Sequence, residues 1–319
     1  MHPAWPLLVF SFLLSFTTIF YAFRTPSTIA VNATTPSPAF PSSWGDVDSD
    51  FDWCELNNRV SPHVSEPFNT ITSAAYPITA LFAWRAHAPL ALSPWHRLNL
   101  CATIAMGAGS MIFHGTLRYW AQLLDELPLY SMALLAAASL RQRHTRAAGV
   151  QPFVAGWVLL LTAVLLFSER SSPLHVAFRV IMACSFSVAF VFIFTVGASI
   201  GNEIDMMRPG SDGASLFRGT FVSFVVAIAS WIADIVFCHE LQALPSGLPY
   251  PQLHAFGWHL GTCYGLLQLF CLMLLHQHVV RDQGQAILQW VAGGLVPRVR
   301  PVGLVHASNS FKSEHKKNI

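Results

Sequence analysis

A few polar residues that could do chemistry stand out in a chain made mainly of apolar residues. Ser110 and His114 are four residues apart and therefore share one face of a helix. Asp125 follows shortly after them, and His254 and His259 lie at the start of the last apolar stretch. Two or three histidines that converge in a partly dry pocket can hold a zinc ion. Three protein ligands leave a fourth position for water, whose pKa the metal lowers toward about 7.

Each of these residues also has a structural alternative. A single histidine in a membrane helix can simply be hydrogen-bonded to a backbone carbonyl, Asp125 can cap a helix start, and Ser110 can pack as a small residue beside Gly107 and Gly109. The following histidines fit such structural, loop or interface positions: His63, His87, His96, His144, His175, His276 and His278. The zinc hypothesis depends on the three polar segments meeting at one membrane face.

A second group of polar residues precedes the first predicted membrane helix. Asp52, Glu55 and Glu66 supply carboxylates, Asn57 supplies an amide oxygen, and Trp53 could supply a backbone carbonyl. Oxygen ligands of this kind suit calcium, which takes six to eight of them. Because the spacing is not that of an EF-hand loop, these residues by themselves favour a solvated acidic loop.

The composition requires a membrane protein. Of 319 residues, 53% are hydrophobic and only 11% are charged, and the mean hydropathy is +0.48. A soluble domain carries about 25% charged residues, so a soluble enzyme, a nucleic-acid binder and a disordered scaffold are all excluded. The net charge of +2 gives no reason to expect a polyanionic partner.

The apolar stretches predict an all-α membrane protein, a seven-transmembrane helix bundle with an extra N-terminal hydrophobic segment. A spanning helix needs about 20 mostly apolar residues. The seven expected spans are 68–84, 98–117, 122–140, 152–168, 173–197, 217–238 and 254–276. If the segment before the first span is lumenal, thirteen of the eighteen Lys and Arg residues fall on the cytosolic side and four on the lumenal side, with Arg179 inside a span. This bias predicts a lumenal N-side and a cytosolic C-terminus, and it places the polar segments at the lumenal face.

The regions outside the spans give four expected parts. Residues 1–24 form a signal peptide, with an uncleaved signal anchor as the alternative, and the Pro-, Ser- and Thr-rich residues 25–50 form a flexible lumenal linker. Asn32 in this linker begins an N-glycosylation sequon. Residues 51–280 form the seven-helix domain, and 281–319 form a loosely ordered cytosolic tail. A lumenal N-side suits a protein of the endoplasmic reticulum or Golgi membrane.

Three motifs together resemble those of the alkaline ceramidases, in the same order along roughly residues 50–280. They are Asp52-Trp53-Cys54-Glu55 with Asn57, Ser61-Pro62, Glu66 and Asn69-Thr70; Gly109-Ser110-Met111 with Phe113-His114 and Gln122-Leu123-Leu124-Asp125-Glu126-Leu127-Pro128; and the His254/His259 segment. The resemblance implies a seven-helix zinc amidohydrolase of the ceramidase and adiponectin-receptor group. Such an enzyme cleaves the amide of a ceramide-type lipid into a sphingoid base and a fatty acid, with the lipid chains entering sideways from the bilayer.

The resemblance also implies roles for individual residues, by their match to these motifs. His114, His254 and His259 would bind zinc, Ser110 would help to position the water or stabilise the oxyanion, and Asp125 would be the general acid and base.

For the N-terminal motif, the resemblance implies a calcium site that couples the loop to the catalytic end. Its ligands would be Asp52, Trp53, Glu55, Asn57 and Glu66. It also implies a disulfide between Cys54 and Cys238, for which two free cysteines are the alternative. Asp234, one turn before Cys238, is expected to be a structural hydrogen-bonding partner.

One departure from the family pattern concerns the last two histidines. The family spaces them four apart, whereas His254 and His259 are five apart and include Gly257. Five residues rotate a regular helix by about 140°. Either a π-bulge at Gly257 restores a common face, or the helix begins only after His254.

Three other functions remain as alternatives at this point. A receptor-like member of the same group with little or no hydrolase activity would be favoured by the five-residue spacing. A non-catalytic lipid-remodelling factor should lack the carboxylate-rich loop, which this chain has. A transporter should have its polar residues near the middle of the membrane, whereas here they gather at one end.

Overall fold

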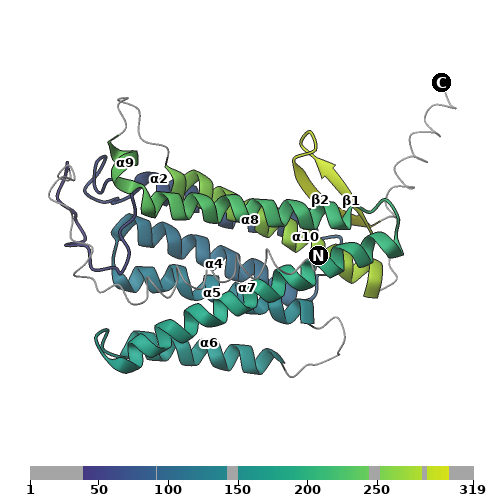
Figure 1. Ribbon diagram of the computed structural model, residues 1–319, viewed down its shortest axis with the longest axis horizontal. Helices are drawn as coiled ribbons and strands as arrows, with labels where there is room; N and C mark the ends of the chain where they lie inside the picture. The colour runs from purple at the N-terminus through teal and green to yellow at the C-terminus, as the bar shows by residue number, and fades with distance from the viewer. Residues whose placement is uncertain (1–38, 91, 142–149, 244–251, 282–285, 302–319) are drawn as a thin grey trace.

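The computed structural model describes residues 39–90, 92–141, 150–243, 252–281 and 286–301. These residues are mainly helical, and the long helices run side by side along one axis (Figure 1). The described elements are α2 (Pro67–Ser73), α3 (Ala75–Ala86), α4 (Pro94–Thr116), α5 (Tyr119–Arg141), α6 (Val150–Phe167), α7 (Pro173–Met207), α8 (Gly213–Val236), α9 (Cys238–Gln242), the π-helical η2 (Leu253–His259), α10 (Leu260–His276), the π-helical η3 (Gln277–Arg281), β1 (Ala286–Val291) and β2 (Val296–Pro301).

Local sequence signals set where the long helices begin. Both α4 and α7 start with a serine followed by a proline, which has the backbone angle of a helix and no N–H to satisfy. The hydroxyl of Ser93 accepts a hydrogen bond from the N–H of His96, and that of Ser172 accepts one from His175. α4 ends where Leu117 adopts a left-handed conformation with φ of 50°. These starts and stops fix where the residues within the helices fall along the bundle.

Among the described residues, four helices are long and apolar enough to cross a membrane. They are Pro94–Thr116, Pro173–Met207, Gly213–Val236 and Leu253–Val280. Helices also occupy the other three predicted segments, with α2 and α3 in the first, α5 in the third and α6 in the fourth. The chain is therefore a helical membrane protein, while the count of seven spans stays a prediction. The N-terminal hydrophobic segment and Asn32 lie outside the described residues.

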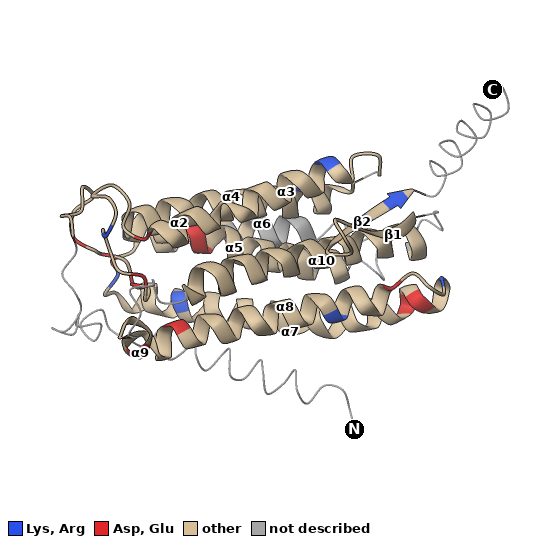
Figure 2. Cartoon of the chain, turned by 90° about the horizontal axis from the view of Figure 1, so that it is seen from above, with Lys and Arg blue, Asp and Glu red and all other residues tan. Residues whose placement is uncertain are grey.

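The core of the bundle forms around α10. This helix is almost wholly apolar, and every residue from Leu267 to His276 is buried. A helix that is apolar on all sides is expected to be surrounded by other elements. Figure 2 shows α10 between the row formed by α3 and α4 and the row formed by α7 and α8. This central helix continues directly from η2, which carries His254 and His259.

The tail prediction is wrong for residues 286–301. This segment forms an antiparallel hairpin in which Ala286 pairs with Pro301 and Val291 with Val296. Ala286 and Val299 are each 1% exposed and belong to the same hydrophobic core as α10. Burial of these apolar side chains orders a segment that was expected to be loose.

The two ends of the bundle differ in what they carry. We call the end with residues 39–66 and α9 the site end, and the end where Arg208 of α7 donates to the carbonyl of Ala286 (2.6 Å) the hairpin end. Figure 2 shows that the charged residues lie mostly toward these two ends. The apolar middle is what a helical bundle in a bilayer requires.

Candidate metal centre

Three buried histidines from two distant parts of the chain meet at the site end. His114 lies in the last turn of α4, and His254 and His259 both lie in η2. Each offers one ring nitrogen, and the three nitrogens lie within 4.8 Å of one another. None of the three residues is more than 3% exposed. Three converging imidazoles in a buried site are a ligand set that suits zinc.

The five-residue spacing of the last two histidines is accommodated by a π-helical turn. In a π-helix the hydrogen bonds join residue i to residue i+5, so His254 and His259 face the same way. The turn packs closely on α8 at Gly257, where a Cβ would lie 2.3 Å from Cβ of Ser230. Of the two alternatives considered for this spacing, the structure has the π-turn.

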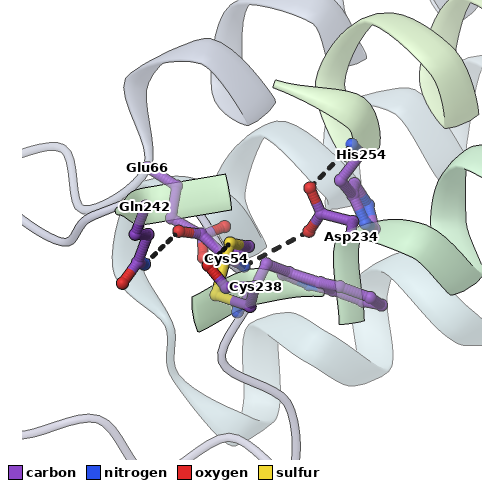
Figure 3. The surroundings of a disulfide bond; sticks show 7 residues. Cys54, Glu66, Asp234, Cys238, Gln242 and His254 are labelled. Carbon is purple, nitrogen blue, oxygen red and sulfur yellow. Dashed lines mark hydrogen bonds between the residues drawn. A yellow bond between two sulfur atoms is a disulfide. The ribbon is translucent and has the colours of Figure 1, made fainter. Parts of the chain in front are cut away.

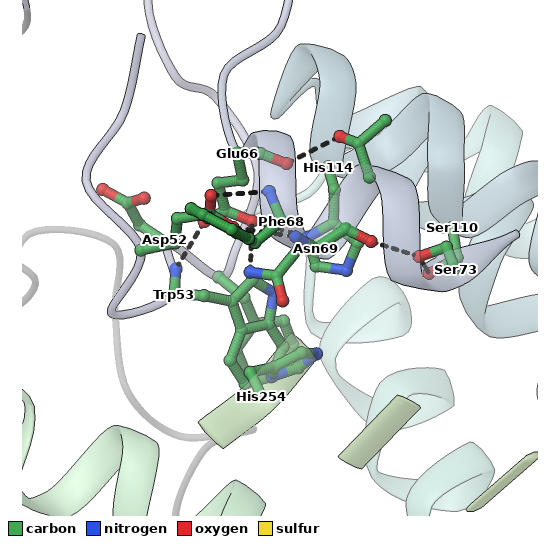
Figure 4. A network of polar contacts seen from close by, with 12 residues as sticks. Asp52, Trp53, Glu66, Phe68, Asn69, Ser73, Ser110, His114 and His254 are labelled. Atoms are coloured by element: carbon green, nitrogen blue, oxygen red, sulfur yellow. Dashed lines mark hydrogen bonds and ion pairs between the residues drawn. The ribbon is translucent and has the colours of Figure 1, made fainter. Parts of the chain in front are cut away.

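The outer ring nitrogens of two of these histidines are held by the loop and by α2. Nδ1 of His114 lies 2.5 Å from Oε2 of Glu66 (Figure 4). Nδ1 of His259 lies 2.8 Å from Oγ1 of Thr72. The Thr72 hydroxyl donates its own proton to the carbonyl of Phe68 (2.8 Å), so it accepts the proton of the imidazole. Both rings therefore have Nε2 free to bind an ion, in the orientation that such outer contacts give to metal-binding histidines.

The third histidine has an unsatisfied nitrogen. Nδ1 of His254 is buried and has no hydrogen-bond partner among the described residues. Its ring centroid lies 3.8 Å from that of Trp53, so the indole covers one side of the ring. A buried polar atom without a partner is costly and needs an explanation. A metal ion among the three imidazoles would provide one, and the donor set therefore fits zinc.

Ser110 and Asp125 lie next to this centre because α4 and α5 approach each other closely. At Gly109 of α4 a Cβ would lie 2.0 Å from the carbonyl oxygen of Leu124 in α5. The close approach lets the side chains of Ser110 and Asp125 form a hydrogen bond. Both line the same cavity as His259. A hydroxyl and a carboxyl group are thus available beside the metal centre.

The cavity extends from this centre into the bundle. Its volume is about 110 Å³, and its walls come from α3, α4, α5, α7, α8, η2 and α10. The end at the histidines is polar, whereas Met132, Phe190, Phe270 and Met273 make the deeper walls apolar. Such a shape suits an elongated apolar group whose polar end reaches the histidines.

Three buried carboxyl groups gather in the loop that precedes α2. Burial raises the pKa of Asp52, and it raises the pKa of Glu55 to about 7. Burial together with the neighbouring carboxylates of Glu55 and Asp52 raises the pKa of Glu66 well above its usual range. The amide oxygen Oδ1 of Asn57 is also buried and has no partner in the described part of the chain. A cation would relieve both the mutual repulsion and the unsatisfied oxygen.

The carboxyl groups are less tightly gathered than the imidazoles. Within the described residues, the three histidines are the one group of three or more His, Cys, Asp or Glu residues placed to share a metal ion. Asp52 instead accepts a hydrogen bond from Asn57 (2.8 Å), and the two oxygens of Glu55 accept from the N–H groups of Phe68 and Asn69 at the start of α2. The loop therefore positions α2 as well as offering oxygen ligands.

A disulfide joins this loop to the start of α9, two residues after the end of α8 (Figure 3). Cys54 and Cys238 are bonded, with their Cα atoms 5.2 Å apart. Asp234 accepts hydrogen bonds from the N–H of Cys54 (3.3 Å) and from the N–H of His254 (3.2 Å), and Gln242 donates to the carbonyl of Cys54 (2.7 Å). One carboxylate thus connects the loop to the backbone that carries a metal-site histidine, which is the structural role expected for Asp234.

Some residues of the site were not identified from the sequence. Thr72 holds His259, and the hydroxyl of Ser73 lies 3.0 Å from that of Ser110. Nδ2 of Asn69 bonds Oε2 of Glu66 (3.2 Å), the oxygen that also bonds His114. Serine and threonine are common in apolar helices as small residues, so nothing in their local sequence distinguishes them from packing residues.

Comparisons with known proteins give a family and several relatives for this chain. A family model described as Ceramidase matches residues 45–300, which extends past the expected limit of 280 and includes the hairpin. Alkaline ceramidase YPC1 of Saccharomyces cerevisiae is 27% identical over 267 residues, which cover 77% of this chain and 81% of the yeast protein. Alkaline ceramidase 3 of Mus musculus is 25% identical over 230 residues, 70% of this chain and 81% of the mouse protein. An alkaline ceramidase of Drosophila melanogaster is 27% identical over 245 residues, which cover 74% of this chain and 81% of the fly protein.

Proposed function

This chain belongs to the ceramidase family, and we propose that it hydrolyses the amide bond of a ceramide to give a sphingoid base and a fatty acid. The observation that carries the proposal is a set of three converging imidazoles, one of which, that of His259, lines an apolar cavity together with the hydroxyl of Ser110 and the carboxyl group of Asp125. The relatives named above as alkaline ceramidases support the same substrate class. The chain would then be a membrane hydrolase acting on its substrate inside the bilayer.

The three histidines would hold zinc. When bound, zinc supplies Lewis acidity toward an amide carbonyl and toward water. His114 and His259 would bind through Nε2, since Nδ1 of each is already engaged by Glu66 and Thr72. These outer contacts fix the ring orientation before any ion arrives.

Ser110 and Asp125 would carry the proton and charge chemistry. Asp125 takes a proton from the attacking water while the water oxygen forms a bond to the carbonyl carbon. Asp125 then gives this proton to the amide nitrogen as the carbon–nitrogen bond breaks. The sphingoid base leaves as a neutral amine, and the other product is the fatty acid. Ser110 donates a hydrogen bond to the oxygen that gains negative charge in between. The apolar walls of the cavity bind a hydrocarbon chain and keep the amide at the histidines.

We also propose that calcium binds in the loop through the carboxylates of Asp52, Glu55 and Glu66, the amide oxygen of Asn57 and the carbonyl of Trp53. The raised pKa values of the carboxyl groups and the unsatisfied Asn57 oxygen support this site. Because Glu66 also holds His114, calcium would affect the catalytic centre through one side chain. Glu66→Ala should therefore remove any stabilisation by calcium, and an unchanged calcium response would contradict the site.

The proposed topology places the site end in the lumen and the hairpin end in the cytosol. The distribution of Lys and Arg supports this orientation. It retains residues 1–24 as a signal peptide or anchor, 25–50 as a lumenal linker with Asn32 as a glycosylation site, 51–280 as the helical domain and 281–319 as a cytosolic segment. The membrane would be that of the endoplasmic reticulum or Golgi.

The receptor-like alternative loses its main support. It was favoured by the five-residue spacing of His254 and His259, and the π-turn lets both histidines face His114 despite that spacing. No other observation on the described residues favours a non-catalytic role over hydrolysis.

The test is hydrolysis of a ceramide, a dihydroceramide and a phytoceramide by the purified full chain in detergent, with release of the sphingoid base as the readout. Asp125→Asn should lose turnover with at least one substrate that the wild type cleaves, because it removes the proton carrier and keeps the shape. Ser110→Ala should give a smaller loss. Equal turnover by the wild type and Asp125→Asn, or none by the wild type on any of the three lipids, would contradict the proposal.

A further inference from the structure

An arginine inside the longest helix connects three parts of the site end. Arg179 of α7 forms an ion pair with Glu126 of α5, and its Nη2 lies 3.1 Å from Oδ2 of Asp50 in the N-terminal loop. The exposed fractions of these side chains are 14%, 14% and 26%. An ionised side chain within a membrane helix is costly unless it is paired, and such residues usually have a functional role.

A glutamine adds a second connection between the same parts. Nε2 of Gln122 donates to Oε1 of Glu126 (2.7 Å), and Oε1 of Gln122 accepts from the N–H of Asp50 (2.7 Å). Gln122 is 0% exposed. Because Gln122 and Glu126 are four residues apart, they form one face of α5. That face is therefore held by both α7 and the loop.

A neighbouring side of the same helical turn carries the proposed proton carrier. Asp125 faces the cavity beside Ser110, and adjacent residues on an α-helix point about 100° apart. The close contact at Gly109 holds α5 against α4 on the side of Asp125. The pair of Arg179 and Glu126 holds α5 on the neighbouring side. Together these two contacts set how α5 is rotated about its own axis.

We infer that Arg179 is a positioning residue for hydrolysis, which acts through Glu126 to keep α5 in the rotation that directs Asp125 into the cavity beside Ser110. The inference rests on the proposed function, since it concerns the proton carrier of that reaction. Without Arg179, the carboxylate of Glu126, which is 14% exposed, would keep only Gln122 as a partner among the described residues, and α5 would have to turn to bring it to water.

A second arginine provides a matched control. Arg170 pairs with the same Asp50 and donates to the carbonyl of Asp48 (2.6 Å), and its guanidinium lies 4.0 Å from the ring centroid of Tyr119. It thus holds the same loop residue as Arg179. Its contact with α5 is at Tyr119, the first residue of that helix, and no contact with Glu126 is recorded for it in the described part of the chain. Loss of Arg170 should therefore disturb the loop and the first turn of α5, and leave the ion pair at Glu126 unchanged.

The experiment compares Arg179→Met, Arg170→Met, Glu126→Gln and the double variant Arg179→Met/Glu126→Gln in the purified full chain. We expect kcat of Arg179→Met to fall roughly 100-fold, as a misplacement of about 1 Å can cause. KM should stay within about twofold and zinc content should not change, since neither the cavity walls nor the histidines are altered. Glu126→Gln in the same background should restore kcat at least about tenfold, because it removes the unpaired charge.

Arg170→Met should keep kcat within about threefold of the wild type, because it leaves the ion pair on α5 intact. If Arg179→Met does not fold, Arg179→Lys replaces it, since a lysine keeps the charge and loses the two-pronged geometry, and it should lower kcat alone. Equal kcat losses for the two arginine variants, an unchanged kcat in Arg179→Met, or no recovery in the double variant would each overturn the inference. Absence of turnover in the wild type would instead overturn the proposed hydrolase function.

Discussion

The two ends of the bundle both bury histidines, but they hold them in different ways. At the hairpin end His87 is 0% exposed, Nδ1 bonds the carbonyl of Ala83 (2.7 Å) and Nε2 accepts from the N–H of Val299 (3.0 Å). Both of its nitrogens are therefore used by the backbone. At the site end His114 and His259 use one nitrogen on a side chain and direct the other toward a second imidazole.

This difference shows what separates a structural histidine from a metal-binding one. Burial alone does not decide, because His87 and His114 are equally inaccessible. The partner of the second nitrogen decides, since two backbone partners leave nothing to bind an ion. His87 accordingly connects α3 to β2, and the interaction fixes the hairpin against the bundle. The predictions below test this contrast.

The largest effect should come from removing a site-end histidine. His114→Ala should lose both zinc and turnover, because two imidazoles do not complete the ligand set. His87→Gln should keep about one zinc ion per chain, since it is far from the centre and was saturated by backbone groups. Metal analysis of the purified proteins alongside ceramide hydrolysis checks both. Loss of zinc from His87→Gln at a temperature where it remains folded would show that the contrast is wrong.

The next largest effect should be a loss of stability at low pH that depends on His87 at the hairpin end. Burial lowers the pKa of His87 to about 4, from an unfolded value near 6.5. The unfolded chain therefore binds the extra proton first, and stability is lost as the pH falls from about 6.5 to about 4. The loss amounts to about 3 kcal/mol. The physical reason is that a proton on Nε2 would face the N–H of Val299.

The measurement is the thermal midpoint of the wild type and of His87→Gln across this pH range. Carboxyl groups and the metal centre contribute equally to both proteins, so the difference between the two curves isolates His87. The curve of the variant should be flatter. Parallel curves would mean that His87 has no part in the acid sensitivity.

Part of this site could be predicted from the sequence because its residues carry local signals. Ser110 and His114 are one turn apart, and the separation of His254 and His259 together with Gly257 already indicated a π-turn as one of two alternatives. The spacing by itself could not choose between them. The choice between a π-turn and a later helix start depends on how Gly257 packs against Ser230 of α8, which is a contact between distant residues.

Other features depend on contacts between distant residues and had no local signal. The bond between Thr72 and His259 joins residues 187 positions apart, and the pair of Arg179 and Glu126 joins two helices. The hairpin is different, because the signal was present. Gly293-Gly294 lies between two runs rich in apolar residues, a pattern typical of a β-hairpin. Pro297 and the arginines beside it made the second run resemble a polar tail.

A smaller effect should follow from loosening one imidazole without removing it. Thr72→Val keeps the shape of the side chain and removes the oxygen that accepts from His259. Loss of such an outer contact lowers metal affinity or activity roughly 10- to 100-fold. Thr70→Val is the matched control, since the hydroxyl of Thr70, on the same short helix, donates to the backbone carbonyl of Glu66 (2.7 Å), and no bond from it to a histidine is recorded among the described residues. Zinc affinity measured by competition with a chelator distinguishes them, and equal affinities would remove Thr72 from the centre.

The smallest effect should come from the packing that keeps His254 at the site end. Gly257→Ala places a methyl group 2.3 Å from Cβ of Ser230, so η2 and α8 must move apart. We expect a loss of about 1 kcal/mol, at the low end for overpacking because a π-turn can tighten to relieve it. Ser230→Gly in the same chain removes the obstructing Cβ, and it should restore both the thermal midpoint and the zinc content. If the double variant stays as impaired as Gly257→Ala, the glycine matters for its backbone conformation, and the contact with α8 does not place the histidine.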